Sequence, residues 1–333
     1  MSPITNCIIN KDTKSNPIWL MRQAGRYLPE FREIRKNNQD FIKLCLNEKL
    51  ASEITLQPII RFGFDAAIIF SDILMLPYGL GQEVVFEKNF GPKLGKLDLE
   101  KFIGISEENF SERLKPIYNL ISITSKNEIL KNRDVIGFVG APWTILVYMI
   151  NKISPKKNLS DNFFDDEILI SKLLNLIEKF LKIHIKNQVD AGANIIQIFD
   201  SWAGLLNGKL LDYIYKPTYN LVDYTKKIGV PVICFPRGIK NYKEFCKIVK
   251  PDMINIDYDV DPKKIASEIE LPIQGGLDPK ILLTDKDKVK NEAEKYLTIF
   301  KDHPYVFNLG HGILPETKID LVKELIHIVR NYK

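Results

Sequence analysis

The sequence has few of the residues that build metal centres and disulfide frameworks. Its 333 residues include four cysteines, Cys7, Cys45, Cys234 and Cys246, and four histidines. No two of the cysteines have the CxxC spacing that is typical of zinc sites and redox motifs. We therefore expect free thiols, as in a protein of a reducing compartment, and no metal ion.

Long apolar runs are also missing. No uninterrupted apolar segment reaches the roughly 18 residues that a membrane span requires. Residues 1–16 lack the apolar stretch of a signal peptide and contain Asp12. These absences predict a cytoplasmic protein with no membrane partner.

Charge of both signs is present, but it is not concentrated anywhere. The 47 Lys and Arg residues exceed the 42 Asp and Glu residues by five, and the hydrophobic fraction of 45% is that of an ordinary globular protein. The basic residues form no run interleaved with aromatic residues, so we expect no nucleic-acid partner. Residues 79–84 approach the GxGxxG pattern but depart from it at the last position, which argues against a phosphate-binding turn.

Short apolar segments alternate with longer amphipathic ones along the whole chain. Expected strands are 17–21, 66–70, 135–139, 194–199, 230–235, 253–257, 271–274 and 305–309. Expected helices include 48–62, 166–189, 210–228, 240–249 and 318–332. Strand–helix alternation indicates parallel crossovers, and apolar strands indicate a sheet covered on both faces.

Eight such units without a break in composition predict an α/β protein with a single-domain (β/α)8 TIM barrel over residues 1–333. A doubly wound open sheet is the competing architecture, and the absence of a dinucleotide fingerprint argues against it. Two segments interrupt the alternation. Residues 78–99 are expected to form a hairpin or lid, and residues 154–166 a polar loop.

The double-arginine segment 17–32, PIWLMRQAGRYLPEFR, is the most informative stretch of the chain. Arg22 and Arg26 each present a planar fork of donors that matches a carboxylate or phosphate. The small residues between them leave room for a flat ligand, and Gly25 permits a backbone conformation closed to other residues. The alternative is a basic surface turn after a strand.

Titratable residues and glycines follow every expected strand, where a (β/α)8 barrel has its active site. Asp72 leaves an apolar strand, where it can accept several hydrogen bonds or balance a cation, cap a helix or pair with an arginine. Tyr148 fits equally well in a helix core, and Ser201 can cap a helix near residue 203. His311 has a glycine on each side, which suits close approach of a ligand. Arg237 is placed for an anion but belongs to no recognised motif.

Several of these segments together resemble the uroporphyrinogen decarboxylase family, and the resemblance covers nearly the whole chain. They are PIWLMRQAGR at 17–26, FSDIL at 70–74, GFVGAPWTILVY at 137–148, QIFDSWAG at 197–204, QGGLDP at 274–279 and NLGHGI at 308–313. The family decarboxylates the four acetate side chains of uroporphyrinogen III to methyl groups, giving coproporphyrinogen III in porphyrin and heme biosynthesis.

The resemblance also implies roles for individual residues. Asp72 is implied to be catalytic and to accept hydrogen bonds from the pyrrole N–H groups. The implied substrate-binding residues are Arg22, Gln23, Ala24, Gly25, Arg26, Asp72, Tyr148, Ser201 and His311, with Arg35 as a secondary candidate. The family implies a homodimer that uses neither a metal nor an organic cofactor. The proton donor stays open between an arginine, Tyr148 and a water held by His311.

Two other functions fit a barrel of this kind. A zinc-dependent methyltransferase acting on cobalamin or a thiol needs a set of histidine and cysteine ligands, and the cysteine nearest to His311 is Cys246, 65 residues upstream. A non-enzymatic porphyrin-binding protein would keep the arginines but would tolerate the loss of Asp72. This sequence has both the arginines and Asp72, which favours an enzyme over a binding protein.

Overall fold

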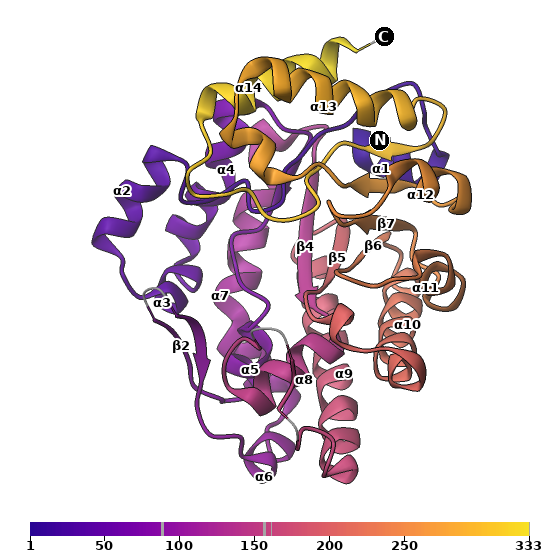
Figure 1. The fold of residues 1–333 in the computed structure, drawn as a ribbon. Helices are drawn as coiled ribbons and strands as arrows, with labels where there is room; N and C mark the ends of the chain where they lie inside the picture. The colour runs from indigo at the N-terminus through magenta and orange to yellow at the C-terminus, as the bar shows by residue number, and fades with distance from the viewer. Residues whose placement is uncertain (88–89, 156–157, 161, 333) are drawn as a thin grey trace.

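The strands of the main sheet are parallel and follow one another in chain order (Figure 1). The computed structural model describes residues 1–87, 90–155, 158–160 and 162–332. The sheet order is β1-β4-β5-β6-β7-β8-β9. The bounds are β1 Ala66–Ile68, β4 Asp134–Gly140, β5 Ile195–Asp200, β6 Val232–Pro236, β7 Met253–Ile256, β8 Ile273–Gly275 and β9 Tyr305–Val306.

An extended segment, residues 17–21, closes this sheet between β9 and β1. Ile18 pairs with Phe307 in a parallel bridge, and the Phe307 N–H donates to the Pro17 carbonyl at 2.8 Å. On the other side, the Asp65 N–H donates to the Ile18 carbonyl at 3.0 Å. The segment therefore takes the position of the eighth strand of a barrel. The (β/α)8 prediction is confirmed, and the doubly wound alternative is wrong because neither edge of the sheet is left open.

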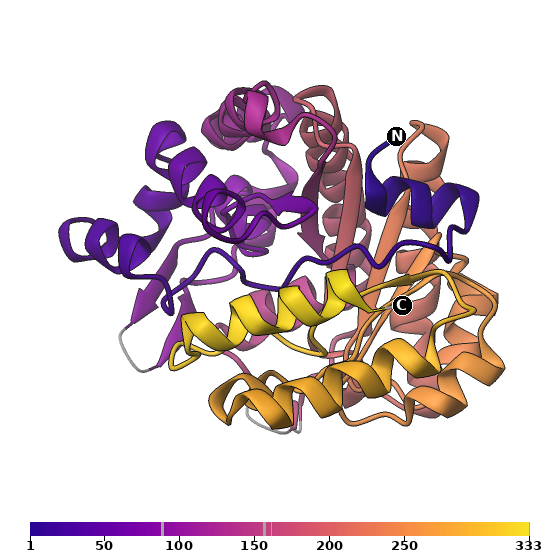
Figure 2. The ribbon, with the colours of Figure 1, turned by 90° about the horizontal axis from the view of Figure 1, so that it is seen from above.

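Helices cover the outer face of the barrel, and neighbouring helices contact one another (Figure 2). The main ones are α4 Glu48–Phe62, α7 Glu107–Ser125, α9 Glu167–Asp190, α10 Asp212–Lys227, α11 Tyr242–Val249, α12 Pro262–Glu268, α13 Lys286–Ile299 and α14 Ile319–Asn331. Further helices are α1 Pro3–Asn10, α2 Pro29–Asn37, α3 Phe41–Cys45, α5 Met75–Gly79, α6 Leu99–Ile103 and α8 Pro142–Asn151. Four 3-10 turns complete the set: η1 Glu128–Leu130, η2 Ala203–Leu205, η3 Gly208–Leu211 and η4 Pro279–Leu283.

The five helices expected from the sequence are present, with ends shifted by no more than two residues. Within the ranges that the structure describes, no helix has both the length and the apolar character needed to cross a membrane.

The amino-terminal end of the barrel is closed by α1. The Asp134 side chain, fully buried at the start of β4, accepts hydrogen bonds from the backbone N–H groups of Ile4 and Thr5 at 3.1 and 3.2 Å. A carboxylate suits the first turn of a helix because the helix dipole and the free N–H groups favour negative charge there. The open end of the barrel is therefore at the carboxyl ends of the strands.

A layer of amide side chains fills part of the barrel interior. The Trp19 indole N–H donates to Gln274 Oε1 at 2.8 Å, and Gln274 Nε2 donates to Asn255 Oδ1 at 2.6 Å and to Gln197 Oε1 at 3.2 Å. All four side chains are fully buried. The strand pattern alone did not reveal this layer, because each residue is a single polar position within an apolar run.

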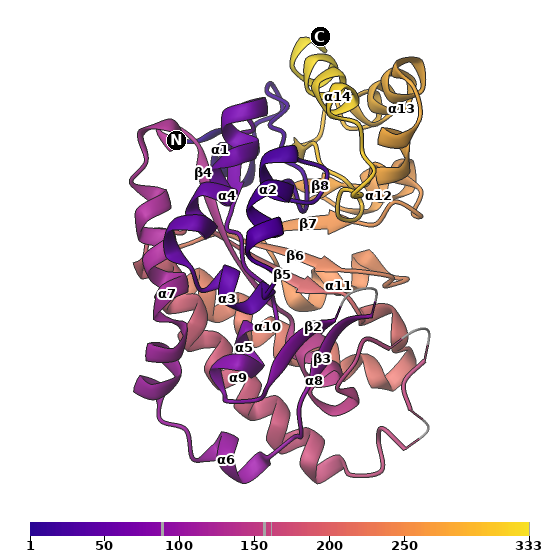
Figure 3. The same ribbon diagram turned by 90° about the vertical axis from the view of Figure 1, so that its left-hand side faces the viewer.

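The expected hairpin is present as β2, Val84–Glu87, paired antiparallel with β3, Gly91–Leu94 (Figure 3). Residues 88–89, between the two strands in the sequence, lie outside the described residues. The polar connector 154–166 contains neither helix nor strand in its described residues, as expected; residues 156, 157 and 161 lie outside them.

Candidate active site

Most of the side chains predicted from the sequence to form the site lie near the carboxyl ends of the barrel strands. Arg22 follows residues 17–21, Asp72 follows β1, Ser201 follows β5 and His311 follows β9. Tyr148 lies in α8, the helix that begins just after β4. The charge of Arg22 acts on the pKa of Asp72, Tyr148 and His311 alike, so these four residues share one site.

The backbone of the double-arginine segment corrects one expectation. Arg22, not Gly25, adopts the left-handed conformation, with a φ of 62°. Gly25 is needed for another reason: a Cβ there would lie 2.8 Å from the Arg22 carbonyl oxygen. A positive φ at a non-glycine residue is uncommon and is found at sites where position matters more than local strain. The turn therefore fixes the direction in which Arg22 leaves the barrel.

Gln23 does not line the site with its side chain, contrary to expectation. The side chain is fully buried, and its amide donates to the Ala66 carbonyl at 2.8 Å and accepts from the Leu20 N–H at 3.1 Å. The amide nitrogen thus joins the turn to β1, and the amide oxygen holds the turn to the preceding residues 17–21. Ala24 and Gly25 remain partly exposed beside it.

The glycines on either side of His311 have a different role from the one expected. A Cβ on Gly312 would lie 2.3 Å from Arg22 Cδ, and one on Gly310 would lie 2.2 Å from the Tyr258 backbone nitrogen. They therefore allow protein atoms, rather than a ligand, to approach closely. The Arg22 side chain packs directly against the backbone of Gly312.

The environment of His311 sets its protonation state. Its Nδ1 accepts a hydrogen bond from the Gly312 N–H at 2.7 Å, which places the proton of the neutral ring on Nε2. Burial, with the charges of Arg22 and Arg237, lowers its pKa to about 4. At neutral pH, His311 is therefore an uncharged hydrogen-bond donor.

Asp72 is the ionisable carboxyl at the centre of the site. Its Oδ1 accepts from the Leu74 N–H at 2.9 Å. Burial raises its pKa to about 6, while the Leu74 hydrogen bond and the Arg22 charge act in the opposite direction. At neutral pH, Asp72 is ionised in surroundings that screen its charge poorly.

Tyr148 and Ser201 complete the part of the site predicted from sequence. The Tyr148 ring lies edge-on to the Trp202 ring with 5.9 Å between centroids, and burial raises the pKa of its hydroxyl. Ser201 does not cap the following 3-10 turn, whose N-cap residue is Trp202. The Ser201 side chain instead lines a pocket.

A buried hydrogen-bonded pair fixes the loop that carries Ser201. The Thr144 hydroxyl donates to Asp200 Oδ1 at 2.6 Å and accepts from the Trp202 N–H at 3.1 Å. Burial raises the pKa of Asp200 to about 7, and its Oδ2 has no hydrogen-bond partner among the described residues. Sequence reasoning gave Asp200 no role; its signal was its position at a strand end.

Arg26 and Arg35 differ in how many guanidinium N–H donors are free to bind a ligand. Arg26 is exposed. The Arg35 guanidinium donates to the carbonyls of Asn38 and Gln39 at 2.6 and 3.0 Å and lies 5.6 Å from the centre of the Phe41 ring. Because the Arg35 head group is already committed to backbone carbonyls, it has fewer donors free for a ligand than Arg26.

Over the described ranges, no group of three His, Cys, Asp or Glu residues is arranged to hold a metal ion. The four cysteines are free thiols, and three of them are buried.

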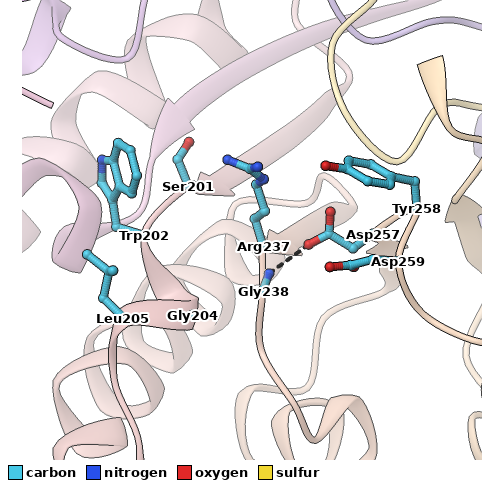
Figure 4. A pocket seen from close by; sticks show the side chains of 9 residues that line it. All are labelled: Ser201, Trp202, Gly204, Leu205, Arg237, Gly238, Asp257, Tyr258 and Asp259. Carbon is cyan, nitrogen blue, oxygen red and sulfur yellow. Dashed lines mark hydrogen bonds between the residues drawn. The ribbon is translucent and has the colours of Figure 1, made fainter. Parts of the chain in front are cut away.

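Arg237, Asp257 and Tyr258 line the same pocket as Ser201, and its volume is about 150 Å³ (Figure 4). The Asp257 carboxylate accepts from the Gly238 N–H at 2.7 Å, and burial raises its pKa to about 6. Sequence reasoning placed Arg237 at a strand end suited to an anion, but it gave Asp257 and Tyr258 no role, because no motif includes them.

Comparison with known proteins identifies the relatives of this chain. Residues 1–332 match the family model for uroporphyrinogen decarboxylase. A uroporphyrinogen decarboxylase of Rickettsia bellii is 41% identical, covering 100% of this chain and 99% of that protein. One from Rickettsia felis is 38% identical, covering 98% of this chain and 96% of that protein.

A solved structure also shares the fold. A methyltransferase from Methanosarcina mazei superposes with a TM-score of 0.80 over 99% of this chain and 98% of that one, at 16% sequence identity. At that identity, the likeness concerns the fold alone.

Proposed function

The chain belongs to the uroporphyrinogen decarboxylase family, and we infer that it decarboxylates the four acetate side chains of uroporphyrinogen III, giving coproporphyrinogen III in heme biosynthesis. One observation carries the proposal from family to site. Asp72, a carboxylate that is ionised at neutral pH, lies within range of the Arg22 charge at the end of the barrel where Arg26 is also exposed. Such a set can hold a ring of pyrroles at its centre and carboxylates at its edge.

The chemistry that such a site must support follows from the substrate. When CO2 leaves an acetate, the electrons of the broken C–C bond need an acceptor. Protonation of the pyrrole carbon makes the ring a cation that accepts them, so the substrate supplies the sink that a cofactor supplies elsewhere. A second proton then reaches the side-chain carbon and the ring proton is released, so that one proton replaces each CO2.

Asp72 is assigned the central role in this reaction. An ionised carboxylate fixed beneath the pyrrole N–H groups accepts hydrogen bonds from them and stabilises the positive charge that develops on the ring. Its partly desolvated position strengthens that interaction relative to water. The Leu74 N–H holds the carboxylate in place at 2.9 Å, so little reorganisation is needed as charge develops.

The remaining residues are assigned to binding. Arg22 and Arg26 hold substrate carboxylates, and His311 donates from Nε2 to an oxygen of the substrate. Tyr148 and Ser201 offer hydroxyl groups. Ala24 and Gly25 line the site beside them, and Arg35 is a secondary contact.

The proposal is tested by incubating the purified protein with uroporphyrinogen III under anaerobic reducing conditions and following coproporphyrinogen III by chromatography. Asp72→Asn keeps the size of the side chain and one acceptor oxygen, but it removes the charge and replaces the other acceptor with an NH2 donor. We expect kcat to fall roughly 100-fold or more, since losing one preorganised electrostatic group costs about 3 kcal/mol.

Three outcomes separate the candidate functions. A folded wild-type protein that forms no product contradicts the decarboxylase function, and porphyrin binding without turnover identifies a carrier instead. Near wild-type turnover by Asp72→Asn contradicts the role of Asp72. Unchanged circular dichroism of the variant serves as the folding control.

We further propose that residues 1–333 act as one domain and form a homodimer in the cytoplasm. The match of the family model to residues 1–332 and a hydrophobic core that extends from α1 to α14 support a single domain. Free cysteines suit a reducing compartment. Light scattering coupled to size-exclusion chromatography tests the dimer: a mass near 77 kDa, about twice the 38.4 kDa chain, is expected.

A further inference from the structure

The pocket that contains Arg237 belongs to the opposite side of the barrel mouth from the double-arginine turn. Its volume is about 150 Å³, and its walls come from the loops after β5, β6 and β7 (Figure 4). The lining residues are Ser201, Trp202, Gly204, Leu205, Arg237, Gly238, Asp257, Tyr258 and Asp259. Arg22, Arg26 and Asp72 are not among them.

We propose that Arg237 binds a second carboxylate of the substrate in this pocket, across the barrel mouth from Arg22 and Arg26. The proposal rests on the proposed function, because it requires a ring that carries carboxylates around its whole edge. It extends that function by assigning a further anchoring residue, which holds the ring without touching the reacting atoms.

The order of the strands places the guanidinium groups of Arg22 and Arg237 on opposite sides of the barrel. Around the closed barrel, the order is residues 17–21, β1, β4, β5, β6, β7, β8 and β9. Arg22 follows the first strand position and Arg237 follows the fifth, so they are four strand positions apart in either direction around the barrel. Both residues follow the carboxyl end of a strand, so they border the same open end of the barrel. A ring held at only one edge would be free to pivot, and a second anchor removes that freedom.

The backbone of Arg237 is held on both sides. Its N–H donates to the Asp200 carbonyl at 3.0 Å, and its carbonyl accepts from the Gly204 N–H at 2.9 Å. Gly204 and Gly238 allow the two loops to meet, because a Cβ on Gly204 would lie 2.9 Å from the Gly238 carbonyl oxygen. The side chain thus starts from a fixed point, which lowers the entropy lost when it binds a ligand.

The guanidinium of Arg237 is available to an anion. It forms no ion pair with any described residue, although Asp257 lies beside it. Asp257 directs its carboxylate to the Gly238 N–H at 2.7 Å, and the guanidinium projects between the hydroxyl ends of Ser201 and Tyr258 (Figure 4). A carboxylate that approaches from the Ser201 side meets the guanidinium fork while staying away from Asp257.

Arg237→Gln tests the proposal because it removes the charge and keeps a polar side chain. We expect the KM for uroporphyrinogen III to rise about 10-fold while kcat stays within about threefold, as for a contact made equally in the ground and transition states. Lys240→Gln, an exposed cation on the same loop outside the pocket, is the matched control and should behave as wild type.

A binding measurement identifies which carboxylate is held. Fluorescence titration uses the non-reacting porphyrins uroporphyrin III, with eight carboxylates, and coproporphyrin III, which lacks the acetates. An equal loss of affinity for both in Arg237→Gln assigns a propionate, and a loss for uroporphyrin alone assigns an acetate. Unchanged KM and unchanged affinity for both porphyrins overturn the proposal, as does a loss of kcat at unchanged KM.

Two further measurements keep this test decisive. If Arg237→Gln fails to fold, Arg237→Lys replaces it; the point charge of lysine cannot form the fork, so a KM rise of about threefold is expected, and an unchanged KM counts against the proposal. If the wild type does not turn over uroporphyrinogen, the proposed function fails. The porphyrin titrations then still decide whether Arg237 holds a carboxylate.

Discussion

At the scale of single residues, Asp72 and His311 have protonation states that their ordinary pKa values do not suggest. Burial raises the pKa of Asp72 to about 6, and burial with two nearby arginines lowers that of His311 to about 4. The residue that titrates near pH 6 is therefore the aspartate. Around neutral pH, Asp72 therefore carries a negative charge and the His311 imidazole is uncharged.

The first prediction concerns the pH dependence of kcat/KM, which reports groups of the free enzyme. If ionised Asp72 is required, kcat/KM falls as the pH drops through about 6, because the carboxyl then takes up a proton. His311→Asn removes the imidazole and should leave this acid limb in place. Rates measured between pH 5 and 8 test this.

The control for that profile is Asp72→Glu, which keeps a carboxyl but moves it and should shift the acid limb while lowering the rate. An acid limb that disappears in His311→Asn and persists unshifted in Asp72→Glu would assign the titration to the histidine instead.

At the scale of elements, the loop after β9 joins three strand ends through its glycines. Gly310 lies against the backbone at the end of β7, and Gly312 lies beneath the Arg22 side chain. The position of the first arginine therefore depends on a loop nearly 300 residues away in sequence. A loop of larger residues would separate these strand ends, because the atoms that a Cβ would meet are already in place.

Gly312→Ala is the second prediction. The added methyl would lie 2.3 Å from Arg22 Cδ and 2.9 Å from its Cγ and Nε, so the Arg22 side chain must move. We expect kcat/KM to fall about 10-fold or more, since displacement of a positioning group by about 1 Å has effects of that size. Steady-state kinetics and thermal unfolding measure the effect.

Gly104→Ala is the matched control. Gly104 has a φ of −75°, its Cβ would lie 3.3 Å from the nearest atom, and it is the C-cap of α6. Its kinetics should equal those of wild type. Equal kinetics for Gly312→Ala would show that Arg22 does not depend on this contact.

At the scale of the whole molecule, the ion pairs lie on the outside of the barrel and not among the arginines at its open end. Most ion pairs join a lysine to an acidic neighbour on the outer helices, as in Lys182–Glu178 and Lys227–Asp223. Of the ion pairs between described residues, none includes the arginines of the mouth, Arg22, Arg26, Arg35 and Arg237.

The third prediction follows from this distribution. Unpaired cations in a concave site attract an anion of high charge, and salt screens that attraction over about 10 Å at 0.1 M. We expect kcat/KM for uroporphyrinogen to fall severalfold between about 0.02 and 0.5 M NaCl. Arg26→Gln should have a lower value at low salt and a weaker salt dependence. A wild-type kcat/KM that does not change with salt contradicts it.

Much of the fold could be predicted because barrel strands have a simple sequence pattern. Residues 135–139 and 194–199 are apolar runs between helices, and they are found in β4 and β5 within one or two residues of the expected ends. The form of residues 17–21 was harder to predict. They complete the barrel through one β-bridge and a few backbone hydrogen bonds rather than as a regular strand. The amide layer of Gln197, Asn255 and Gln274 was not foreseen, because a pattern of apolar residues does not show which polar exceptions face one another.

The sequence by itself determined the alternation of strands and helices, the residues at each strand end and the family, because these depend on local periodicity and on motifs of a few residues. Tertiary structure decided what depends on distant atoms meeting. It showed that Arg22 rather than Gly25 takes the left-handed conformation, that Gln23 is buried against β1, and that the glycines beside His311 make room for Arg22 and β7. Burial and neighbouring charge likewise set the pKa of Asp72, and neither can be read until the barrel has closed around it.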